Sequence, residues 1–352
     1  MRIVDAALTA YRLPLATPWE TAAGRWHERQ GWLIRITDQS GRCGLGDAAP
    51  LPASDTETLS QAQSWLNAQL TTLIGEMSEP ACARLPPAPA HPAARCGLET
   101  ALLDLQSKQQ GLPLYQRLGG TSVDVVRLNA AIGALDQQTD ERAIAAVAAG
   151  YSTLKLKLGL SPIETELSLL EQLCAQLPGG VRLRLDANRA WRMPEAADLI
   201  RKLNRLPIES LEEPLRHPTP ETLQELQFLA RFDLALDESL PGYIRAQQLQ
   251  PIPVHRIIIK PACLGGLIPA LAMIRQAHQS GIACVITSTL ESSAGLWPLC
   301  HLAATADALT APAIHGLATS HWFSRDLGDP PVITNGQTTL GSEPGTGFIL
   351  KM

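Results

Sequence analysis

The chain has 352 residues, of which 45% are hydrophobic and 18% charged, enough to bury a large core in one or two domains. A net charge of −5, 4% aromatic residues and the lack of any Lys/Arg tract argue against nucleic-acid binding and favour a small-molecule partner. Seven cysteines, none in a C-x-x-C pair, exclude a disulfide framework and a Cys-rich zinc site. No apolar run approaches the roughly 18 residues of a membrane helix, and Asp5 and Arg12 interrupt any signal-peptide pattern. We therefore expect a reduced, cytoplasmic protein that does not associate with membranes.

The first 120 residues have the pattern of an α+β segment. Apolar alternation predicts strands at Ile3–Leu13 and Trp32–Asp38, and a turn follows at Ser40-Gly41. Helical periodicity predicts helices at Glu57–Leu73 and Ala93–Gln110, joined by a Pro-rich connector. Residues 17–29, between the two strands, allow two interpretations: a mobile lid over a site, or an ordinary strand connection.

From residue 127 onward, short apolar or alternating runs recur about every 22 to 29 residues, with helical patterns between them. The eight runs predicted as strands are Arg127–Ile132, Thr153–Lys157, Val181–Asp186, Ile208–Glu212, Asp233–Asp237, Arg256–Lys260, Ile282–Ser288 and Ala311–His315. Pro at helix starts and Gly after helix ends support helices at Thr139–Ala149, Pro162–Leu177, Pro194–Leu203, Pro220–Ala230 and Gly266–Gln279. Strands that alternate with helices form a parallel sheet, and eight of them indicate a (β/α)8-type barrel.

In two of the predicted strands the charged residues occupy alternate positions and therefore share one face of the strand. In TLKLKLG, which starts at Thr153, the leucines share one face, while Lys155 and Lys157 share the other. In VRLRLDAN, which starts at Val181, Arg184 and Asp186 likewise lie opposite the leucines. Because helices cover the outside of a parallel barrel, we expect these charges to point into it.

Carboxylates end three successive predicted strands, at Asp186, Glu212 and Asp237. Three carboxylates that converge at a barrel mouth without Cys or His favour a hard cation, Mg²⁺ or Mn²⁺, over zinc. Lys260 ends the next strand, so that lysines flank the predicted metal site on both sides. The neighbouring acids Glu213 and Glu238 alternate with these carboxylates and would point to the opposite face, so we expect them to be structural.

The series K-x-K, D-x-N, E-E-P, D-E-S and K-P resembles the enolase superfamily, in the subgroup that contains muconate-lactonising enzymes. Three segments are more similar to its o-succinylbenzoate synthase family: RLRLDANRAW (Arg182–Trp191), TSTLESSAGL (Thr287–Leu296) and GLGDAAPLP (Gly44–Pro52). The resemblance implies an α/β fold with a modified (β/α)7β TIM-type barrel over residues 121–324. It also implies an α+β capping domain over residues 1–120, completed by about residues 325–352.

The resemblance further implies a reaction and roles for the charged residues. The family reaction is the Mg²⁺-dependent syn dehydration of SHCHC, a cyclohexadiene carboxylate with a succinyl arm, to 2-succinylbenzoate in menaquinone biosynthesis, which makes the enzyme a carbon-oxygen lyase. Lys157 would be the general base, with Lys155 lowering its pKa by like-charge repulsion. Lys260 would stabilise the enediolate that forms when the proton leaves, next to a metal held by the three carboxylates.

A dicarboxylate substrate needs a receptor for its second carboxylate, and Thr287–Ser293 offers one. Ser288 and Glu291 fit the S-x-x-E capping box at the start of a helix, whose free amides bind anions. Thr287, Ser288 and Ser292 are therefore predicted to bind substrate, with a simple helix cap as the alternative. Asn188 and Arg184 are further candidates for substrate binding; the alternatives are that Asn188 orients a metal ligand or a lysine and that Arg184 pairs with a carboxylate inside the barrel.

Two other functions compete with the synthase. An N-acylamino acid racemase or dipeptide epimerase would use Lys157 and Lys260 as opposed bases on the same scaffold. The resemblance implies an Asp-x-Asp near the eighth strand of dipeptide epimerases, and AIHGLAT (Ala313–Thr319) has no acid, which disfavours that activity. A non-catalytic binding protein predicts the loss of at least one lysine or metal ligand, and none is missing.

Overall fold

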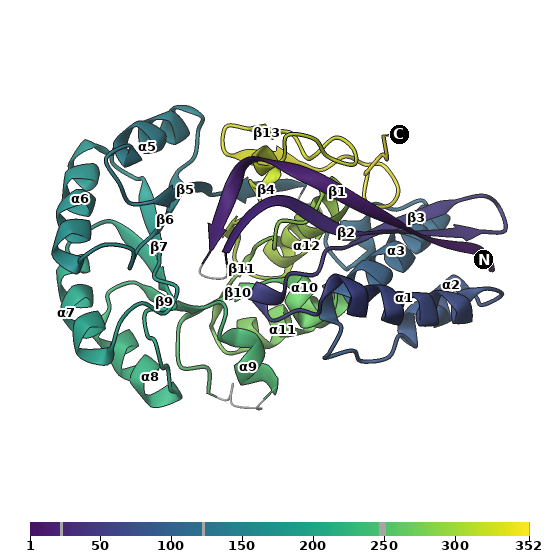
Figure 1. Ribbon diagram of the computed structural model, residues 1–352, viewed down its shortest axis with the longest axis horizontal. Helices are drawn as coiled ribbons and strands as arrows, with labels where there is room; N and C mark the ends of the chain where they lie inside the picture. The colour runs from purple at the N-terminus through teal and green to yellow at the C-terminus, as the bar shows by residue number, and fades with distance from the viewer. Residues whose placement is uncertain (22–23, 122–123, 246–250, 352) are drawn as a thin grey trace.

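The computed structural model describes residues 1–21, 24–121, 124–245 and 251–351, and it shows a barrel joined to a cap (Figure 1). The barrel is built on a parallel seven-stranded sheet in the order β11-β10-β9-β8-β7-β6-β5. Its strands are β5 (Ala130–Ala134), β6 (Thr153–Lys157), β7 (Arg182–Asp186), β8 (Ile208–Glu212), β9 (Asp233–Leu236), β10 (Arg256–Ile259) and β11 (Ala283–Ile286). The helices that follow them are α5 (Thr139–Ala148), α6 (Ile163–Gln176), α7 (Met193–Leu203), α8 (Pro220–Leu229), α9 (Leu240–Arg245), α10 (Pro261–Leu264), α11 (Leu267–Gln279) and α12 (Ser293–Leu309). The predicted fold class, an α/β barrel with a capping domain, is confirmed.

The eighth strand, β12 (Ile314–His315), is two residues long and lies between β4 and the β11 edge of the parallel sheet. It pairs with β4 (Val125–Leu128), and Gly316 N donates to Ile286 O of β11 at 2.9 Å. The predicted strand Arg127–Ile132 is therefore divided between β4 and β5. The remaining strands of the β4 sheet are β13 (Ile333–Thr334) and β14 (Gln337–Thr339).

The leucines of β6 and β7 confirm the predicted parity of these strands. Leu154, Leu156, Leu183 and Leu185 are fully buried and belong to one hydrophobic cluster with residues of the outer helices, such as Leu170. On the other face, Lys155, Asp186 and Arg184 pair with charged residues inside the barrel.

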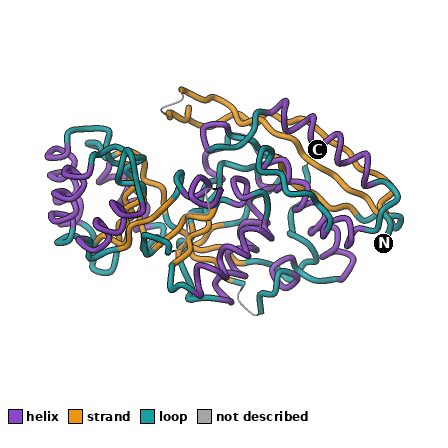
Figure 2. Tube along the Cα trace, turned by 90° about the horizontal axis from the view of Figure 1, so that it is seen from below, coloured by secondary structure: helices purple, strands orange, loops and turns teal. Residues whose placement is uncertain are grey.

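The cap consists of a three-stranded antiparallel sheet with helices packed against it. Its strands are β1 (Ile3–Thr21), β2 (Gly24–Asp38) and β3 (Cys43–Ala48), and its helices are η1 (Pro52–Ser54), α1 (Leu59–Leu73), α2 (Ser78–Ala83), α3 (Pro92–Gln110) and α4 (Leu114–Arg117). Strands β1 and β2 continue well past the predicted ends and form one long hairpin, visible as paired orange strands in Figure 2. Most of the proposed lid, residues 17–29, is therefore strand backbone, and its residues 22–23 lie outside the described residues.

Strand β3 and helix α3 meet backbone to backbone at three glycines. A Cβ on Gly44 would lie 2.1 Å from Ala101 O, and one on Gly46 would lie 2.0 Å from Gly97 O. A Cβ on Gly97 would in turn lie 2.8 Å from the backbone of Asp47. Any side chain at these positions would push the sheet and the helix apart.

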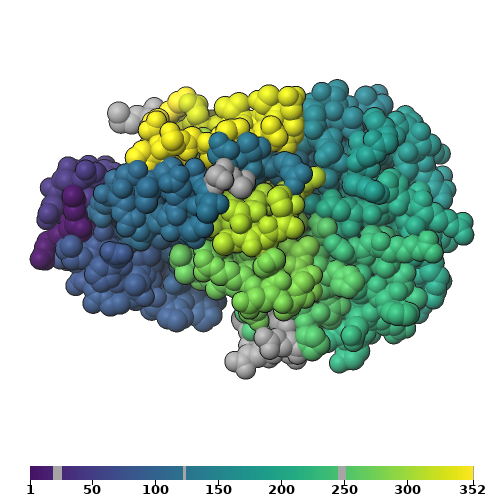
Figure 3. Space-filling model, turned by 180° about the vertical axis from the view of Figure 1, so that it is seen from behind, coloured from purple at the N-terminus to yellow at the C-terminus, as the bar shows by residue number. Residues whose placement is uncertain are grey.

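The C-terminal segment connects the cap with the barrel. In Figure 3, which shows the molecule from behind, this segment is yellow and lies along both the cap and the barrel. After the 3-10 helix η2 (Ser320–Trp322) and the β13–β14 hairpin, Gly345 N donates to Leu112 O at 2.9 Å. Among the described residues, no helix is both long and apolar enough to cross a membrane, and all seven cysteines are free thiols.

Candidate active site

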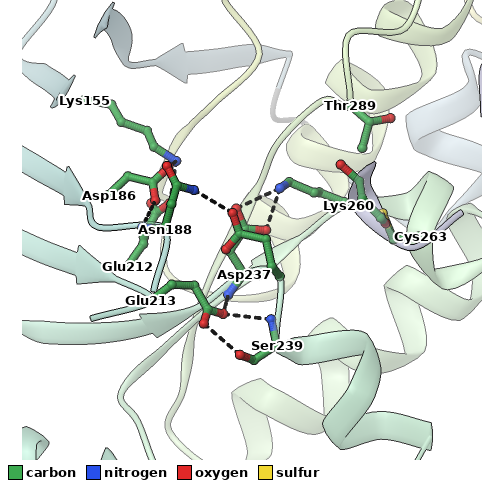
Figure 4. A network of polar contacts seen from close by, with 12 residues as sticks. Lys155, Asp186, Asn188, Glu212, Glu213, Asp237, Ser239, Lys260, Cys263 and Thr289 are labelled. Carbon is green, nitrogen blue, oxygen red and sulfur yellow. Dashed lines mark hydrogen bonds and ion pairs between the residues drawn. The ribbon is translucent and has the colours of Figure 1, made fainter. Parts of the chain in front are cut away.

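The ends of β6, β7 and β8 bring the predicted catalytic residues together. In the sheet register, Lys157 pairs with Asp186, and Asp186 pairs with Glu212, so that these three residues lie at one level. Asp237 and Lys260 directly follow the next two strands, and their side chains point toward this group (Figure 4). The structure thus gathers the predicted lysines and carboxylates at one end of the barrel.

Two of the three lysines are held by carboxylates. Lys155 Nζ forms ion pairs with Glu212 and, at 3.1 Å, with Asp186. Lys260 Nζ lies 2.6 Å and 2.7 Å from the two carboxylate oxygens of Asp237. Lys157 is half-buried and makes no ion pair with any of the described residues. Lys157 is therefore the lysine whose amino group is left for another partner.

The electrostatics of the site are dominated by crowded, buried carboxylates. Burial raises the pKa of Glu212 to about 7, with Lys155 opposing the shift and the nearby acids adding to it. Burial also raises the pKa of Glu238 to about 7, and Asp237 adds to this by repulsion. Burial disfavours the ammonium of Lys155, but its acidic neighbours outweigh this and hold the pKa of Lys155 well above its usual range. Lys155 is thus a fixed cation.

A divalent cation fits this donor set. The carboxylates repel one another in a desolvated pocket, and the buried Glu238 Oε2 has no hydrogen-bond partner among the described residues. All the donors are hard oxygens, as Mg²⁺ prefers. In this structure the carboxylates contact lysines and do not converge on one point. In the described part of the chain, no group of three Asp, Glu, His or Cys side chains is close enough to bind one metal ion without rearrangement.

The adjacent acids Glu213 and Glu238 have different roles, which parity alone did not distinguish. Glu213 accepts hydrogen bonds from Asp237 N at 2.7 Å and from Ser239 N at 2.8 Å. It thereby fixes the loop that presents Asp237, and it does so at a positive φ of 45°. Glu213 is structural, as predicted.

Glu238 lies at the site itself, which sequence reasoning missed. Its Oε1 accepts a hydrogen bond from Asn188 Nδ2 at 2.7 Å, and the backbone N of Asn188 donates to Asp186 at 3.2 Å. The side chain of Asn188 thus bonds Glu238, and only its backbone amide contacts the predicted metal ligand Asp186. The D-E-S sequence itself was the available signal, since a residue just past the strand end need not follow strand parity.

The start of α12 differs from the prediction. The helix begins at Ser293, and the predicted capping box of Ser288 and Glu291 is wrong: Ser288 Oγ donates to Thr319, and Glu291 accepts from Thr289 N at 2.7 Å. The first amides of α12 are already bound. Ser292 N donates to Asp47 at 2.8 Å, and Ser293 N donates to Asp326 at 3.0 Å. These amides are not available to a substrate anion.

Two predicted substrate-binding residues are used inside the protein instead. Ser292 is fully buried, and its hydroxyl also donates to Asp47 at 2.7 Å. Arg184 is 1% exposed and pairs with Glu209 at 2.9 Å inside the barrel, the alternative that its parity allowed. We remove both from the candidate set. Thr287 stays in it, because its buried Oγ1 has no hydrogen-bond partner among the described residues.

Comparison with known proteins places this arrangement in a family. Residues 138–352 match the family described as enolase C-terminal domain-like, and residues 3–105 match the MenC N-terminal domain. The chain belongs to the enolase superfamily. It is therefore a member of a superfamily of Mg²⁺-dependent enzymes, which agrees with the donor set described above.

Relatives within the enolase superfamily include different activities. The chain is 32% identical to o-succinylbenzoate synthase of Yersinia enterocolitica over 89% of this chain and 90% of that protein. It is 28% identical to L-Ala-D/L-Glu epimerase of Bacillus subtilis over 99% and 97%. Among solved structures, a dipeptide epimerase of Methylococcus capsulatus, complexed with Mg and dipeptide L-Arg-D-Lys, is 28% identical, with a TM-score of 0.87 over 99% of each chain.

Proposed function

We propose that the protein is an o-succinylbenzoate synthase, a carbon-oxygen lyase that dehydrates SHCHC to 2-succinylbenzoate. The observation that carries the proposal is a difference between two lysines: Lys157 has no ion-pair partner among the described residues, whereas Lys260 is paired with Asp237. One free base and one fixed cation suit a reaction in which a single lysine moves the proton. The match to the MenC N-terminal domain supports the same assignment.

In this mechanism Lys157 removes the proton next to the substrate carboxylate as a general base. The electron pair moves into the enediolate, and loss of the hydroxyl group with return of the proton releases water and leaves an aromatic ring. Lys260 stabilises the developing negative charge from the opposite face, and Lys155 keeps Asp186 and Glu212 in place.

Asp186, Glu212 and Asp237 would hold Mg²⁺. When bound, the cation neutralises part of the charge that develops on the substrate carboxylate. Glu213 keeps Asp237 in position through its hydrogen bonds to the Asp237 and Ser239 amides. We assign catalysis to a barrel domain of residues 121–324, covered by a capping domain of residues 1–120 with residues 325–352, and Mg²⁺ as its natural cofactor.

The direct test is turnover of SHCHC. Purified protein mixed with SHCHC and Mg²⁺ is expected to give the ultraviolet absorbance of the aromatic product. The Lys157→Ala variant, which lacks the proposed base, serves as the negative control. No aromatic product from folded protein at saturating Mg²⁺ would refute the synthase assignment.

The second candidate is an N-acylamino acid racemase, favoured by the positions of Lys157 at the end of β6 and Lys260 just after β10, on either side of the carboxylate-bearing strands β7, β8 and β9. A dipeptide epimerase is less consistent with this chain, since the end of β12 and the residues after it, up to Thr319, carry no acid. The variant Lys260→Arg separates the two reactions. Arg keeps the cation but cannot act as a base, so racemisation should vanish before dehydration does. Racemisation of an N-succinylamino acid at the unaltered rate would show that Lys260 is not a second base.

A further inference from the structure

Arg29, on β2 of the cap, is a buried cation that the proposed mechanism does not use. Its side chain is 4% exposed, and its guanidinium donates to backbone carbonyl oxygens on three segments of the chain. The acceptors are Gln30 O at 3.3 Å, Pro50 O at 2.7 Å, Leu290 O at 3.1 Å, Thr289 O at 3.3 Å and Ala49 O. Only the planar, five-donor guanidinium can make such a set of contacts.

The segments that Arg29 joins border the barrel mouth on two sides of Lys260. Residues 49–50 lead into η1, where Ser54 O accepts a hydrogen bond from the thiol of Cys263 at 3.2 Å. Cys263 lies three residues after Lys260. Residues 289–290 follow the end of β11, where Thr287 N donates to Ile259 O at 3.0 Å, next to Lys260 on the other side. Arg29 therefore sets the spacing between a cap loop and a barrel loop.

Two further observations show that this junction is specific. Leu290 has a φ of +60°, a conformation rarely adopted by a branched apolar residue, and its carbonyl points at Arg29. Beside it, Asp47 of the cap accepts hydrogen bonds from both the amide and the hydroxyl of Ser292 in the barrel. Tyr11 OH donates to the other oxygen of Asp47 at 2.6 Å. Cap and barrel are thus tied together at the same loop by two charged side chains.

We propose that Arg29 is a positioning residue that forms the substrate pocket by holding the 49–50 loop and the 289–290 loop together. The substrate class is a carboxylate with a removable α-proton and a polar arm that extends from the barrel mouth to the cap; this rests on the proposed function. Arg29 touches neither the lysines nor the carboxylates, so it acts on how the substrate is held and not on proton transfer. Its loss should weaken substrate binding more than turnover.

The test compares Arg29→Met with Arg35→Met. Arg35 lies on the same strand, but it is half-exposed and pairs with the exposed Asp5 at 3.4 Å. In Arg29→Met we expect KM to rise at least about tenfold, with kcat within about threefold of the unaltered protein, because several hydrogen bonds to a charged group are lost. Arg35→Met should leave both constants unchanged. Millimolar guanidinium should lower the raised KM of Arg29→Ala part of the way toward that of the unaltered protein. It should have no effect on the KM of Arg35→Ala.

Hydrogen exchange supplies a readout that does not depend on the reaction. The amides of Ala49 and Leu51 and those of residues 287–291 should exchange faster together in Arg29→Met, with Mg²⁺ affinity unchanged. Faster exchange in one loop alone, or an unchanged KM with both loops loosened, would overturn the proposal. If Arg29→Met does not fold, Arg29→Lys replaces it, since it keeps the charge but cannot reach both loops. If the unaltered protein does not turn over SHCHC, the proposed synthase function is wrong. The role of Arg29 is then decided by hydrogen exchange together with KM for an N-succinylamino acid.

Discussion

The two sides of the barrel mouth differ in the groups that they present. The side formed by the ends of β6 to β10 carries lysines and carboxylates that contact one another directly. The side formed by the ends of β11 and β12 presents the hydroxyls of Thr287, Ser288 and Thr319. The charged residues behind it, Arg29 and Asp47, bind the cap to the barrel.

This difference separates chemistry from recognition. The charged side is rigid, because each of its residues sits on or just after a strand whose register is fixed by its neighbours. The uncharged side is shaped by contacts between distant segments of the chain. Changes on the charged side should therefore alter turnover, and changes on the other side should alter binding and stability.

Metal removal is expected to have the largest effect. Exhaustive treatment with EDTA should abolish activity, and added Mg²⁺ should restore it, because the crowded carboxylates of Asp186, Glu212 and Asp237 need a counter-charge. Asp186→Asn should lose Mg²⁺ binding in calorimetry. Full activity after chelation would contradict the assignment of these three ligands.

Loss of Lys157 should have the next largest effect. Lys157→Ala removes the group expected to take the proton and should lower kcat by about 10²- to 10⁴-fold, measured by steady-state kinetics. Lys202→Ala is the matched control, since Lys202 pairs with Glu164 on the surface of the barrel at 2.8 Å. Near-normal turnover of folded Lys157→Ala would exclude Lys157 as the base.

A smaller effect is expected at the residue behind Asp237. Glu213→Gln weakens the hydrogen bonds that hold the Asp237 loop and should lower Mg²⁺ affinity by about 10- to 100-fold. Glu164→Gln, an exposed acid, should leave the affinity unchanged. Equal affinities for the two variants would show that the Asp237 loop keeps its shape without Glu213.

The smallest expected effect concerns stability within helix α12, which begins at the uncharged side and continues away from the barrel mouth. His301 of α12 accepts a hydrogen bond from Tyr115 N at 3.1 Å and faces Thr346 O at 3.0 Å, and burial lowers its pKa to about 4. Since an unfolded histidine titrates near 6.5, the unfolded chain binds the extra proton below that pH. This part of the stability is fully present above pH 6.5 and is lost as the pH falls toward 4, by about 2 kcal/mol at pH 5.

His301→Gln checks this effect, because Gln preserves an acceptor and a donor but does not titrate. Urea unfolding at pH 7.5 and pH 5 should show a smaller pH-dependent loss for the variant than for the unaltered protein. The same loss in both proteins would mean that His301 does not carry this pH dependence. Activity at pH 7.5 should remain, since His301 lies away from the lysines.

The charged side could be predicted from the sequence because its signals are local. Strand parity alone places Lys155, Lys157 and Asp186 inside the barrel, and the structure brings them together with Glu212 and Asp237. Glu238 was missed because it lies two residues past the end of β9, where the alternation of faces no longer applies.

The uncharged side could not be predicted in the same way. The amide of Ser292 is bound by Asp47, 245 residues away in the chain, and that of Ser293 by Asp326. A local capping motif gives no sign of such distant partners. Helix α12 itself was recognised only at its start, because it is buried on nearly all sides and lacks the one-sided apolar stripe that marks a surface helix.

The glycines between β3 and α3 have a consequence for how variants of this protein should be interpreted. Gly44, Gly46 and Gly97 leave no space for a methyl group, so in a library selected for growth or activity almost every substitution there should disappear. Their intolerance would equal that of the predicted metal ligands, although they belong to the cap's own sheet-to-helix contact. A mutational profile alone would therefore mark this contact as a functional hotspot, and only a stability measurement on the same variants would separate packing from chemistry.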